Sequence, residues 1–463
     1  MDACLGKIPR FCDAHPRSLL LCHKQGQAPV SAISWTPSAQ EKRFAANISR
    51  LSQSVGHADR KIPLKNYCTG LLLPGERKGV QPMAARLAPS SAGRLSQSLN
   101  HLVADAPWSD EALLKHVRSC VQPAMEKSGP IIAWIVADTV FRKKGTHSAG
   151  VAQQENGQAG KAENSQVAVS LSVATWSSSL PIAWRLYLPE SWARDRRRRS
   201  EVGVPEEVRF QTKPQIALEQ IRQAVSEQVP RGVVAAGACY GMERGFRAGV
   251  SALGLPYVAE VQSSVMVWAQ GQQSSPTEKR HLRSRAARRS VREEKMQILS
   301  AQELALALPP WAWKSASWRQ GIRGAFSSLF AAVRVRCAYR KNRNATSQAE
   351  EWLLIDWPRG EAQPTRYWLS TLRSDTPLPD LVKLAKHDWI VERDSRELKE
   401  EVGLENYEGR GWRGVHHHAT LCIAAYGFLV AERNGFSPLT RVGRVELPRP
   451  EISRDFSPRA LVA

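Results

Sequence analysis

The spacing of hydrophobic residues predicts short helices in the first third of the chain. Between residues 41 and 128, apolar side chains recur three and four positions apart in stretches such as "EKRFAANISRLSQSV" and "SDEALLKHVRSCVQPAMEK", which is the period of an amphipathic helix. The second stretch opens with Ser109 as a predicted N-cap and Glu111 in the first turn, where an acid suits the helix dipole. Such helices fit a helix-turn-helix DNA reader and equally a plain helical bundle.

The middle of the chain changes to the pattern of β-strands. Three consecutive stretches rich in Val, Ile, Trp and Tyr are strand candidates: "IIAWIVADTVF", "SQVAVSLSVAT" and "LPIAWRLYLP". An amphipathic helix, "KPQIALEQIRQAVSEQV", and a short apolar run at 233–236 follow, and then a helix around 245–253 and a strand at "PYVAEVQ". Antiparallel strands followed by alternating strands and helices predict an α/β core.

The last third combines further strands with two helices. The stretches "AAVRVRCAYR", "EWLLIDWP" and "RYWLSTL" predict an inserted β-unit, "DLVKLAKHDWIVERDSRELKEEVGL" predicts one long amphipathic helix, and "HHHATLCIAAYGFLVAERNGF" predicts a buried helix. We therefore expect six regions in chain order: a poorly ordered extension at 1–40, a helical DNA-binding region at 41–128, the first part of the core at 129–262, a basic loop with the inserted β-unit at 263–376, the second part of the core at 377–436, and a tail at 437–463.

Charge sets this chain apart from an ordinary globular protein. Its 463 residues include 65 Lys and Arg against 43 Asp and Glu, which gives a formal net charge of +22. This excess favours a partner made of phosphates, because nucleic-acid affinity comes largely from neutralised phosphates. A ribosome-like role and binding to an anionic membrane surface remain alternatives. The charge run at 278–295 fits either a solvated loop or a contact to a DNA backbone.

Two other classes of protein are disfavoured by the sequence. No apolar run reaches about 18 residues, so no membrane span is predicted. The eight cysteines include no C-x-x-C pair, which argues against a zinc site and a disulfide framework. Reduced thiols in a cytoplasm fit this pattern best.

Three positions along the predicted core suggest metal-dependent chemistry. Asp138 lies near the end of the first strand, Gly237 ends a later strand, and Glu392 lies on the long helix, with Lys399 seven residues further along the same face. Carboxylates are hard oxygen ligands of the kind that Mg²⁺ or Mn²⁺ prefers, and two such ions about 4 Å apart can stabilise a phosphodiester displacement. A single Asp near a strand end is more often a turn or cap residue.

The sequence resembles the DDE transposases of bacterial insertion sequences, of the insertion sequence 701 type, over most of residues 44–436. The stretches that carry the resemblance occur in this order: "NYCTGLLLPGERKGVQPMAARLAP", "WIVADTVFRKKGTHSAGVAQQ", "SQVAVSLSVA", "WRLYLPESWA", "GVPEEVRFQTKPQIALEQI", "YWLSTL" and "YEGRGWRGVHHHATLCIAAYGFLVAER". The resemblance implies an α/β fold with an RNase H-like mixed sheet core, an inserted β-unit and an N-terminal helical domain.

The family pattern also assigns the first two acids of the site. The first strand of the family reads W-I-x-D-D-T-G-F, and "WIVADTVF" keeps an acid only at Asp138, beside Ala137. We expect Asp138 to be the metal ligand because it directly precedes a Thr, but neighbouring strand residues point to opposite faces, so Ala137 is the alternative ligand position. The second strand reads V-V-L-A-D-A-x-Y-G, and "VVAAGACYG" has Gly237 at the place of the second Asp. Glu243, six residues further on, is not expected to replace it.

The third acid belongs to a helix signature, Y-x2-R-x3-E-x6-K. The stretch "KHDWIVERDSRELK" keeps Glu392 and Lys399 at the family spacing, whereas the Tyr and Arg positions hold Ala385 and Asp388. The resemblance implies that Lys399 approaches the DNA backbone beside the scissile phosphate. An acid at position 388 should instead repel DNA.

Two segments after this helix also suggest functional roles. The motif "GRGWRG" offers Arg410 and Arg413 to DNA phosphates. The adjacent His416, His417 and His418 point to different sides of a helix, so we expect a structural or DNA-facing role rather than a metal site.

The resemblance implies an enzyme that binds the double-stranded DNA of transposon ends and targets, as a homodimer in a synaptic complex. It implies two Mg²⁺ or Mn²⁺ ions for strand cleavage and transfer, and a cytoplasmic, nucleoid-associated location in a bacterium. Because Gly237 replaces a metal ligand, we expect this chain to be impaired as an endonuclease. The alternatives are a catalytically inactive, transposase-derived DNA-binding protein and a structural RNA-binding protein.

Overall fold

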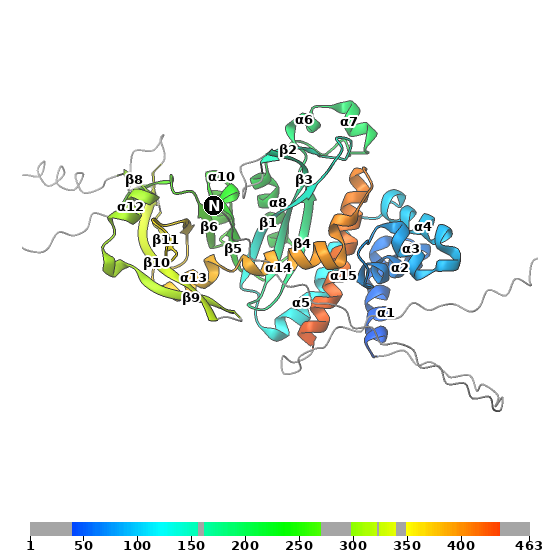
Figure 1. The fold of residues 1–463 in the computed structure, drawn as a ribbon, viewed down its shortest axis with the longest axis horizontal. Helices are drawn as coiled ribbons and strands as arrows, with labels where there is room; N and C mark the ends of the chain where they lie inside the picture. Colours follow the sequence, from blue (N-terminus) through cyan, green and yellow to red (C-terminus); the bar gives the residue numbers. More distant parts are fainter. Residues whose placement is uncertain (1–38, 156–161, 270–297, 322–323, 339–348, 436–463) are drawn as a thin grey trace, which may run out of the picture.

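A mixed β-sheet forms the centre of the protein (Figure 1). The computed structural model describes residues 39–155, 162–269, 298–321, 324–338 and 349–435. Five strands make the core in the spatial order β4-β3-β1-β5-β6. Their bounds are Ala133–Arg142 for β1, Ala162–Ala174 for β3, Ser179–Leu186 for β4, Val233–Ala236 for β5 and Tyr257–Val261 for β6.

The directions of these strands identify the fold. β3 is antiparallel to both β1 and β4, whereas β5 is parallel to both β1 and β6. The first three strands form a meander, and β5 and β6 are added on the other side of β1 through helical crossovers. A five-stranded mixed sheet with this order is an RNase H-like core, so the predicted fold class is confirmed.

Helices cover both faces of the core sheet. On one face lie α8 (Lys213–Ser226), the short α9 (Ala238–Gly241) and α10 (Arg244–Ala252), and on the other lie α13 (Leu378–Ala385) and α14 (Trp389–Glu397). Because side chains alternate along a strand, successive residues of β1 pack under different helices. Ala133 and Ile135 contact the α14 side, whereas Trp134 turns to the α8 side, where its Nε1–H donates to Pro230 O at 2.8 Å.

The inserted β-unit extends the same sheet beyond β6, in the order β6-β12-β11-β10-β7-β8, with β9 paired to β10. β12 pairs antiparallel with β6, so the last strand of the insertion lies directly beside the core. The elements of the insertion are β7 (Met266–Ala269), β8 (Ile298–Ser300), α12 (Ala301–Ala307), β9 (Lys314–Gly321), β10 (Gly324–Cys337), β11 (Glu351–Trp357) and β12 (Arg366–Ser370).

The N-terminal helices pack around a long buried helix, α15 (Trp412–Gly435), at the end of the molecule opposite the inserted β-unit (Figure 1). Phe44 meets Phe428 edge to face at 5.1 Å. The predicted N-cap is confirmed, since the Ser109 hydroxyl accepts from Ala112 N–H. These helices are α1 (Ala39–Leu51), α2 (Lys61–Leu72), α3 (Val80–Leu87), α4 (Ala92–Asn100) and α5 (Asp110–Ser128).

A small corner caps the sheet beyond the end of β1. It consists of β2 (Ala152–Glu155), which pairs with β3, and of α6 (Glu190–Ala193) and α7 (Arg196–Glu201). The loop after β1 reaches this corner, because Arg198 of α7 donates to Thr146 O at 3.2 Å.

The prediction of one long helix after the insertion is wrong. α13 ends at Ala385, α14 starts at Trp389, and a π-helical turn follows at 398–402. The break has a physical reason, since the two halves bury against different parts of the sheet. The connecting residues are also bound, with Lys386 Nζ 2.6 Å from Asp356 Oδ2 and His387 Nε2 2.8 Å from Thr175 O.

Three sequence predictions concern residues outside the described part of the chain. They are the poorly ordered extension, of which residues 1–38 are not described, the charge run at 278–295 and the tail at 437–463. Within the described ranges, no helix combines the length and the apolar character needed to span a membrane.

Candidate active site

Asp138 lies on the α8 face of the sheet. It is paired with Val169 in β3, and residues opposite each other share a face. The Asp138 Oδ2 accepts from Lys213 Nζ at 2.6 Å, and the Tyr240 hydroxyl donates to Oδ1. Lys213 is the first residue of α8, and the Thr212–Gln215 capping box fixes the start of that helix. Both oxygens of Asp138 are therefore engaged by side chains of the same face.

The Asp138 carboxylate sets the protonation of both of its partners, Lys213 and Tyr240. Burial opposes the charge of Lys213, but the Asp138 carboxylate more than offsets it, so the pKa of Lys213 is raised. Burial together with the same carboxylate raises the pKa of Tyr240 well above its ordinary value, which keeps the phenol neutral and able to donate. Asp138 thus completes a local ion-pair and hydrogen-bond network, and a metal ion would have to displace Lys213 to reach it.

The residue of β1 that faces α14 is Ala137. It packs with Ile135 of its own strand, with Ala235 of β5 and with Ile390 and Val391 of α14. The side chain that shares a face with the signature helix is therefore a methyl group. The structure does not bring Asp138 and Glu392 to the same face of the sheet.

Gly237 lies beside Ala137 on this α14 face. The parallel register pairs Ile135 with Ala235 and Val136 with Ala236, so the next neighbours are Ala137 and Gly237. Ala235 packs toward α14, and strand alternation returns position 237 to that side. Gly237 has φ −73° and ψ 174°, which any residue adopts, and a Cβ added there meets nothing within 4 Å. Neither backbone nor space requires glycine at this position.

Glu392 lies on the exposed side of α14, one residue after the buried Val391. Burial and the nearby Asp388 carboxylate raise the pKa of Glu392, while the Arg366 guanidinium acts in the opposite direction. Glu260 of β6 also raises this pKa. The helix signature thus presents its carboxylate to a cluster of charged side chains beside position 237.

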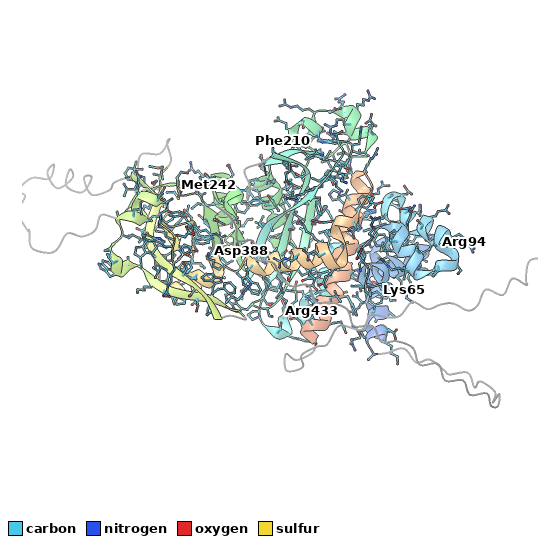
Figure 2. All side chains as sticks on the ribbon, viewed as in Figure 1. Lys65, Arg94, Phe210, Met242, Asp388 and Arg433 are labelled. Atoms are coloured by element: carbon cyan, nitrogen blue, oxygen red, sulfur yellow. The ribbon has the colours of Figure 1, made fainter. Side chains whose placement is uncertain are left out.

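That cluster is centred on Arg366, which the sequence alone did not indicate. Arg366 Nε and Nη2 donate to the two oxygens of Glu260 at 3.0 and 2.8 Å, and Nη2 also donates to Asp388 at 3.3 Å. The guanidinium lies 4.9 Å from the ring centre of Trp368. Figure 2 marks Asp388 where the inserted β-unit meets the core. Because Arg366 and Glu260 are 106 residues apart, only the pairing of β12 with β6 brings them together.

The predicted DNA-contacting residues lie near the end of β1 and along the start of α15. Lys399 donates to Val140 O at 3.1 Å and forms an ion pair with Glu405 at 2.9 Å. Arg410 has an exposed side chain, while its carbonyl accepts from Ala149 N–H. Arg413 donates to Asp105 O at 2.9 Å, which connects α15 to the N-terminal helices.

The three adjacent histidines lie in the interior. His417 contacts Val103 O and Trp108 O at 3.1 and 2.9 Å, and burial lowers its pKa to about 4. The Nδ1 atom of His418 forms a hydrogen bond of 2.9 Å with the Tyr67 hydroxyl. Burial also lowers the pKa of His418 to about 4. His416 accepts from Leu186 N–H, which fixes the end of β4. Their surroundings are those of structural groups.

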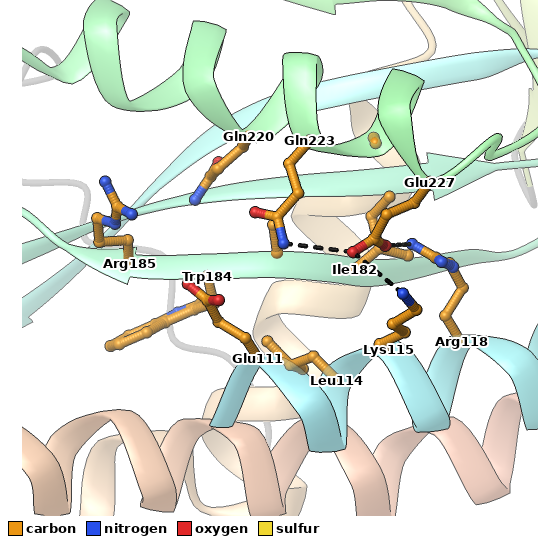
Figure 3. Close-up of a pocket in the computed structure, with 12 residues that line it drawn as sticks. Glu111, Leu114, Lys115, Arg118, Ile182, Trp184, Arg185, Gln220, Gln223 and Glu227 are labelled. Atoms are coloured by element: carbon orange, nitrogen blue, oxygen red, sulfur yellow. Dashed lines mark hydrogen bonds and ion pairs between the residues drawn. The ribbon is translucent and has the colours of Figure 1, made fainter. Parts of the chain in front are cut away.

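A separate pocket lies between α5, β4 and α8 and does not include the candidate site (Figure 3). The Glu227 carboxylate closes one end of it by pairing with Arg118 at 2.6 Å and Lys115 at 3.7 Å. Glu243 is also remote from α14, because it precedes α10 on the α8 face.

The side chains on the α14 face do not fit a two-metal site. Of the three family-motif positions that lie on this face, Ala137 and Gly237 carry no oxygen ligand, and only Glu392 does. Within the described residues, no group of three or more His, Cys, Asp or Glu side chains is arranged to hold a metal ion. A pair of divalent ions needs several hard oxygen ligands, and positions 137 and 237 supply none.

Comparison with known proteins shows what the chain is similar to in sequence and in structure. A family model described as "DDE superfamily endonuclease" matches residues 50–325. The protein "Probable transposase for insertion sequence element IS701" of Microchaete diplosiphon is 28% identical over 169 residues, which are 36% of this chain and 41% of that protein. This alignment therefore spans less than half of the relative. A solved structure, a piggyBac transposase synaptic complex with hairpin DNA, matches at a TM-score of 0.34 and 10% identity, covering 88% of this chain and 69% of that one.

Proposed function

Since the chain belongs to the DDE superfamily endonucleases, as its resemblance to insertion-sequence transposases predicted, we propose that it is a transposase by descent that binds double-stranded DNA and has lost metal-dependent strand cleavage. One observation carries the proposal. The strand register puts Ala137 and Gly237 side by side under α14, where the family carries acids. Glu392 alone cannot provide the ligands that two divalent ions require.

Support for DNA binding comes from a basic corner, which we define as the loop 142–148, α7 and Arg410. Exposed cations of this corner include Lys144, Arg196 and Arg410, and Figure 2 shows side chains projecting from α6 and α7 into solvent. The corner contacts α6, because the Arg198 guanidinium of α7 stacks 3.8 Å from the ring centre of Trp192. Such a surface matches the spaced charges of a duplex backbone.

The experiment measures binding and cutting by the unmodified protein side by side. The substrates are a duplex carrying any inverted repeats found in the DNA that flanks the gene, and a supercoiled plasmid, in Mg²⁺ or Mn²⁺. We expect salt-sensitive binding and no nicking above background. Binding should weaken in Arg196→Glu/Arg197→Glu but not in the control Arg359→Glu, an exposed reversal in the loop between β11 and β12. Robust metal-dependent cutting by the unmodified protein would refute the proposed loss.

A homodimer that holds two DNA ends is part of the same proposal. Light scattering of the protein with and without the repeat duplex checks it, and a complex containing one chain per duplex at all ratios would argue against it. Binding without preference for the repeats would favour a general nucleic-acid-binding role instead.

A further inference from the structure

The α14 face contains three carboxylates and a guanidinium beside Gly237, a family-motif position that here carries no acid. Glu260 is the neighbour of Gly237 across the β5–β6 pair, since Ala236 pairs with Ala259. Glu260 and Arg366 project to the same face, because Trp368, two residues after Arg366, is the partner of Glu260. Asp388 precedes α14 and Glu392 lies in its first turn. The acids thus come from β6 and from the signature helix, and the guanidinium comes from the inserted β-unit.

These carboxylates need a positive charge to lie together. Like charges in a partly buried site repel each other strongly, and Glu260 is only 23% exposed. Arg366 supplies the charge in a bidentate contact to Glu260 and a further bond to Asp388. Planar, bidentate recognition of carboxylates is the particular ability of arginine, and its charge is permanent.

We propose that the Arg366 guanidinium acts as a built-in counter-ion that takes the place of a divalent cation on the α14 face. This inference rests on the proposed loss of metal-dependent cleavage. The signature Arg position on the helix holds Asp388, and the guanidinium now comes from β12. The contact between Arg366 and Asp388 thereby connects the start of α14 to β12 of the inserted β-unit without a metal ion.

Binding of Mn²⁺ to the α14 face should depend on whether Arg366 is present. With Arg366 in place, its guanidinium occupies both oxygens of Glu260 and one oxygen of Asp388, so added Mn²⁺ should not bind this face. Once Arg366 is replaced by a neutral residue, Glu260 and Asp388 lose the guanidinium that they share beside Glu392. A hard divalent cation should then bind these oxygens weakly and restore part of the lost stability.

The test uses the whole chain and Mn²⁺ alone as the probe. Thermal midpoints and Mn²⁺ electron paramagnetic resonance titrations are compared for the unmodified protein, Arg366→Gln, Arg366→Lys and Arg373→Gln. Arg373 is the matched control, because it forms an exposed Arg–carboxylate pair with Asp375, at 2.8 Å, outside the cluster. All titrations are repeated with NaCl at equal ionic strength.

We expect Mn²⁺ to bind Arg366→Gln in the millimolar range and to raise its midpoint by about 2–4 °C at ten times the dissociation constant. The unmodified protein, Arg366→Lys and Arg373→Gln should show no response beyond that to NaCl. Adding Glu260→Gln and Asp388→Asn to Arg366→Gln should abolish the response. Equal Mn²⁺ binding by all variants, or none by Arg366→Gln, would overturn the proposal.

Should Arg366→Gln fail to fold alone, its refolding from urea is measured with and without Mn²⁺. Recovery that requires Mn²⁺ supports the proposal, and failure in both conditions overturns it. This experiment involves no DNA and no restored aspartate. Cutting by the unmodified protein would therefore refute the proposed function while leaving the Mn²⁺ response to decide the role of Arg366.

Discussion

The two faces of the core sheet differ sharply at the ends of β1 and β5. On the α8 face, Asp138 keeps both of its partners, Lys213 and Tyr240, in contacts that satisfy both carboxylate oxygens. On the α14 face, the corresponding positions hold Ala137 and Gly237. The α8 face thus holds a complete ion-pair and hydrogen-bond network, while the α14 face has no carboxylate at these two positions. Ala137 and Asp138 are adjacent in β1, but their side chains lie on opposite faces of the sheet.

The two faces also differ in how much their residues at these strand ends contribute to folding. Removing Asp138 would leave a partly buried ammonium without its partner, which costs folding free energy. Ala137, by contrast, is a packed methyl group, and Gly237 is an unstrained glycine. The fold therefore does not depend on an acid at either position.

The largest effect is expected at Asp138. Asp138→Ala leaves Lys213 and Tyr240 without their shared acceptor, so the free energy of unfolding should fall by about 2–3 kcal/mol. Urea unfolding measures this loss, with Asp375→Ala, in an exposed ion pair, as a control that should leave the midpoint unchanged. A stable Asp138→Ala protein would indicate that the α8-face network does not support the fold.

A smaller effect is expected at Asp388 on the opposite face. This carboxylate is 38% exposed and holds one bond to Arg366, while Glu260 provides the bidentate contact. Asp388→Asn should lower the free energy of unfolding by less than about 1 kcal/mol, as for other exposed ion pairs. A loss as large as that of Asp138→Ala would erase the difference between the two faces.

The smallest effect is expected at Glu392, and it depends on pH. The folded state raises the pKa of this carboxyl above its ordinary 4.5, so the folded chain holds the proton more tightly than the unfolded chain. Stability therefore falls as pH rises through the window just above 4.5. Glu392→Gln should remove this dependence and gain a few tenths of a kcal/mol at pH 7, since the exposed site is screened. Unfolding of both proteins from pH 4 to 8 measures it, and a destabilised variant at pH 7 would contradict the assignment.

Much of the fold could be predicted from the sequence. The strand runs, the helix spacing and the family motifs locate the core, the inserted β-unit and the N-terminal helices. They also locate Gly237 and Glu392, since both are read directly from motif positions. The predicted long helix failed because one amphipathic pattern continues through Lys386 and His387, which the sheet binds in a break between two helices.

The choice between positions 137 and 138 could not be made from the sequence. Alternation of polar and apolar residues reveals the face of a strand only when one side is solvated. Residues 133–136 of β1 are buried on both faces, so the pattern gives no face. Arg366 was missed for another reason, because its contact with Glu260 depends on the pairing of distant strands, which no local signal reports.

The most direct test of the central claim is a Mn²⁺ titration of two restored proteins, Gly237→Asp and Ala137→Asp/Gly237→Asp. Both carry Arg366→Gln, and Arg366→Gln alone provides the baseline, so that the guanidinium is equally absent from all three. If Ala137 marks the ligand position, only the protein with both aspartates should bind Mn²⁺ at least tenfold more tightly than the baseline. Equal tightening by Gly237→Asp, with the native Asp138 as the other acid, would contradict the account.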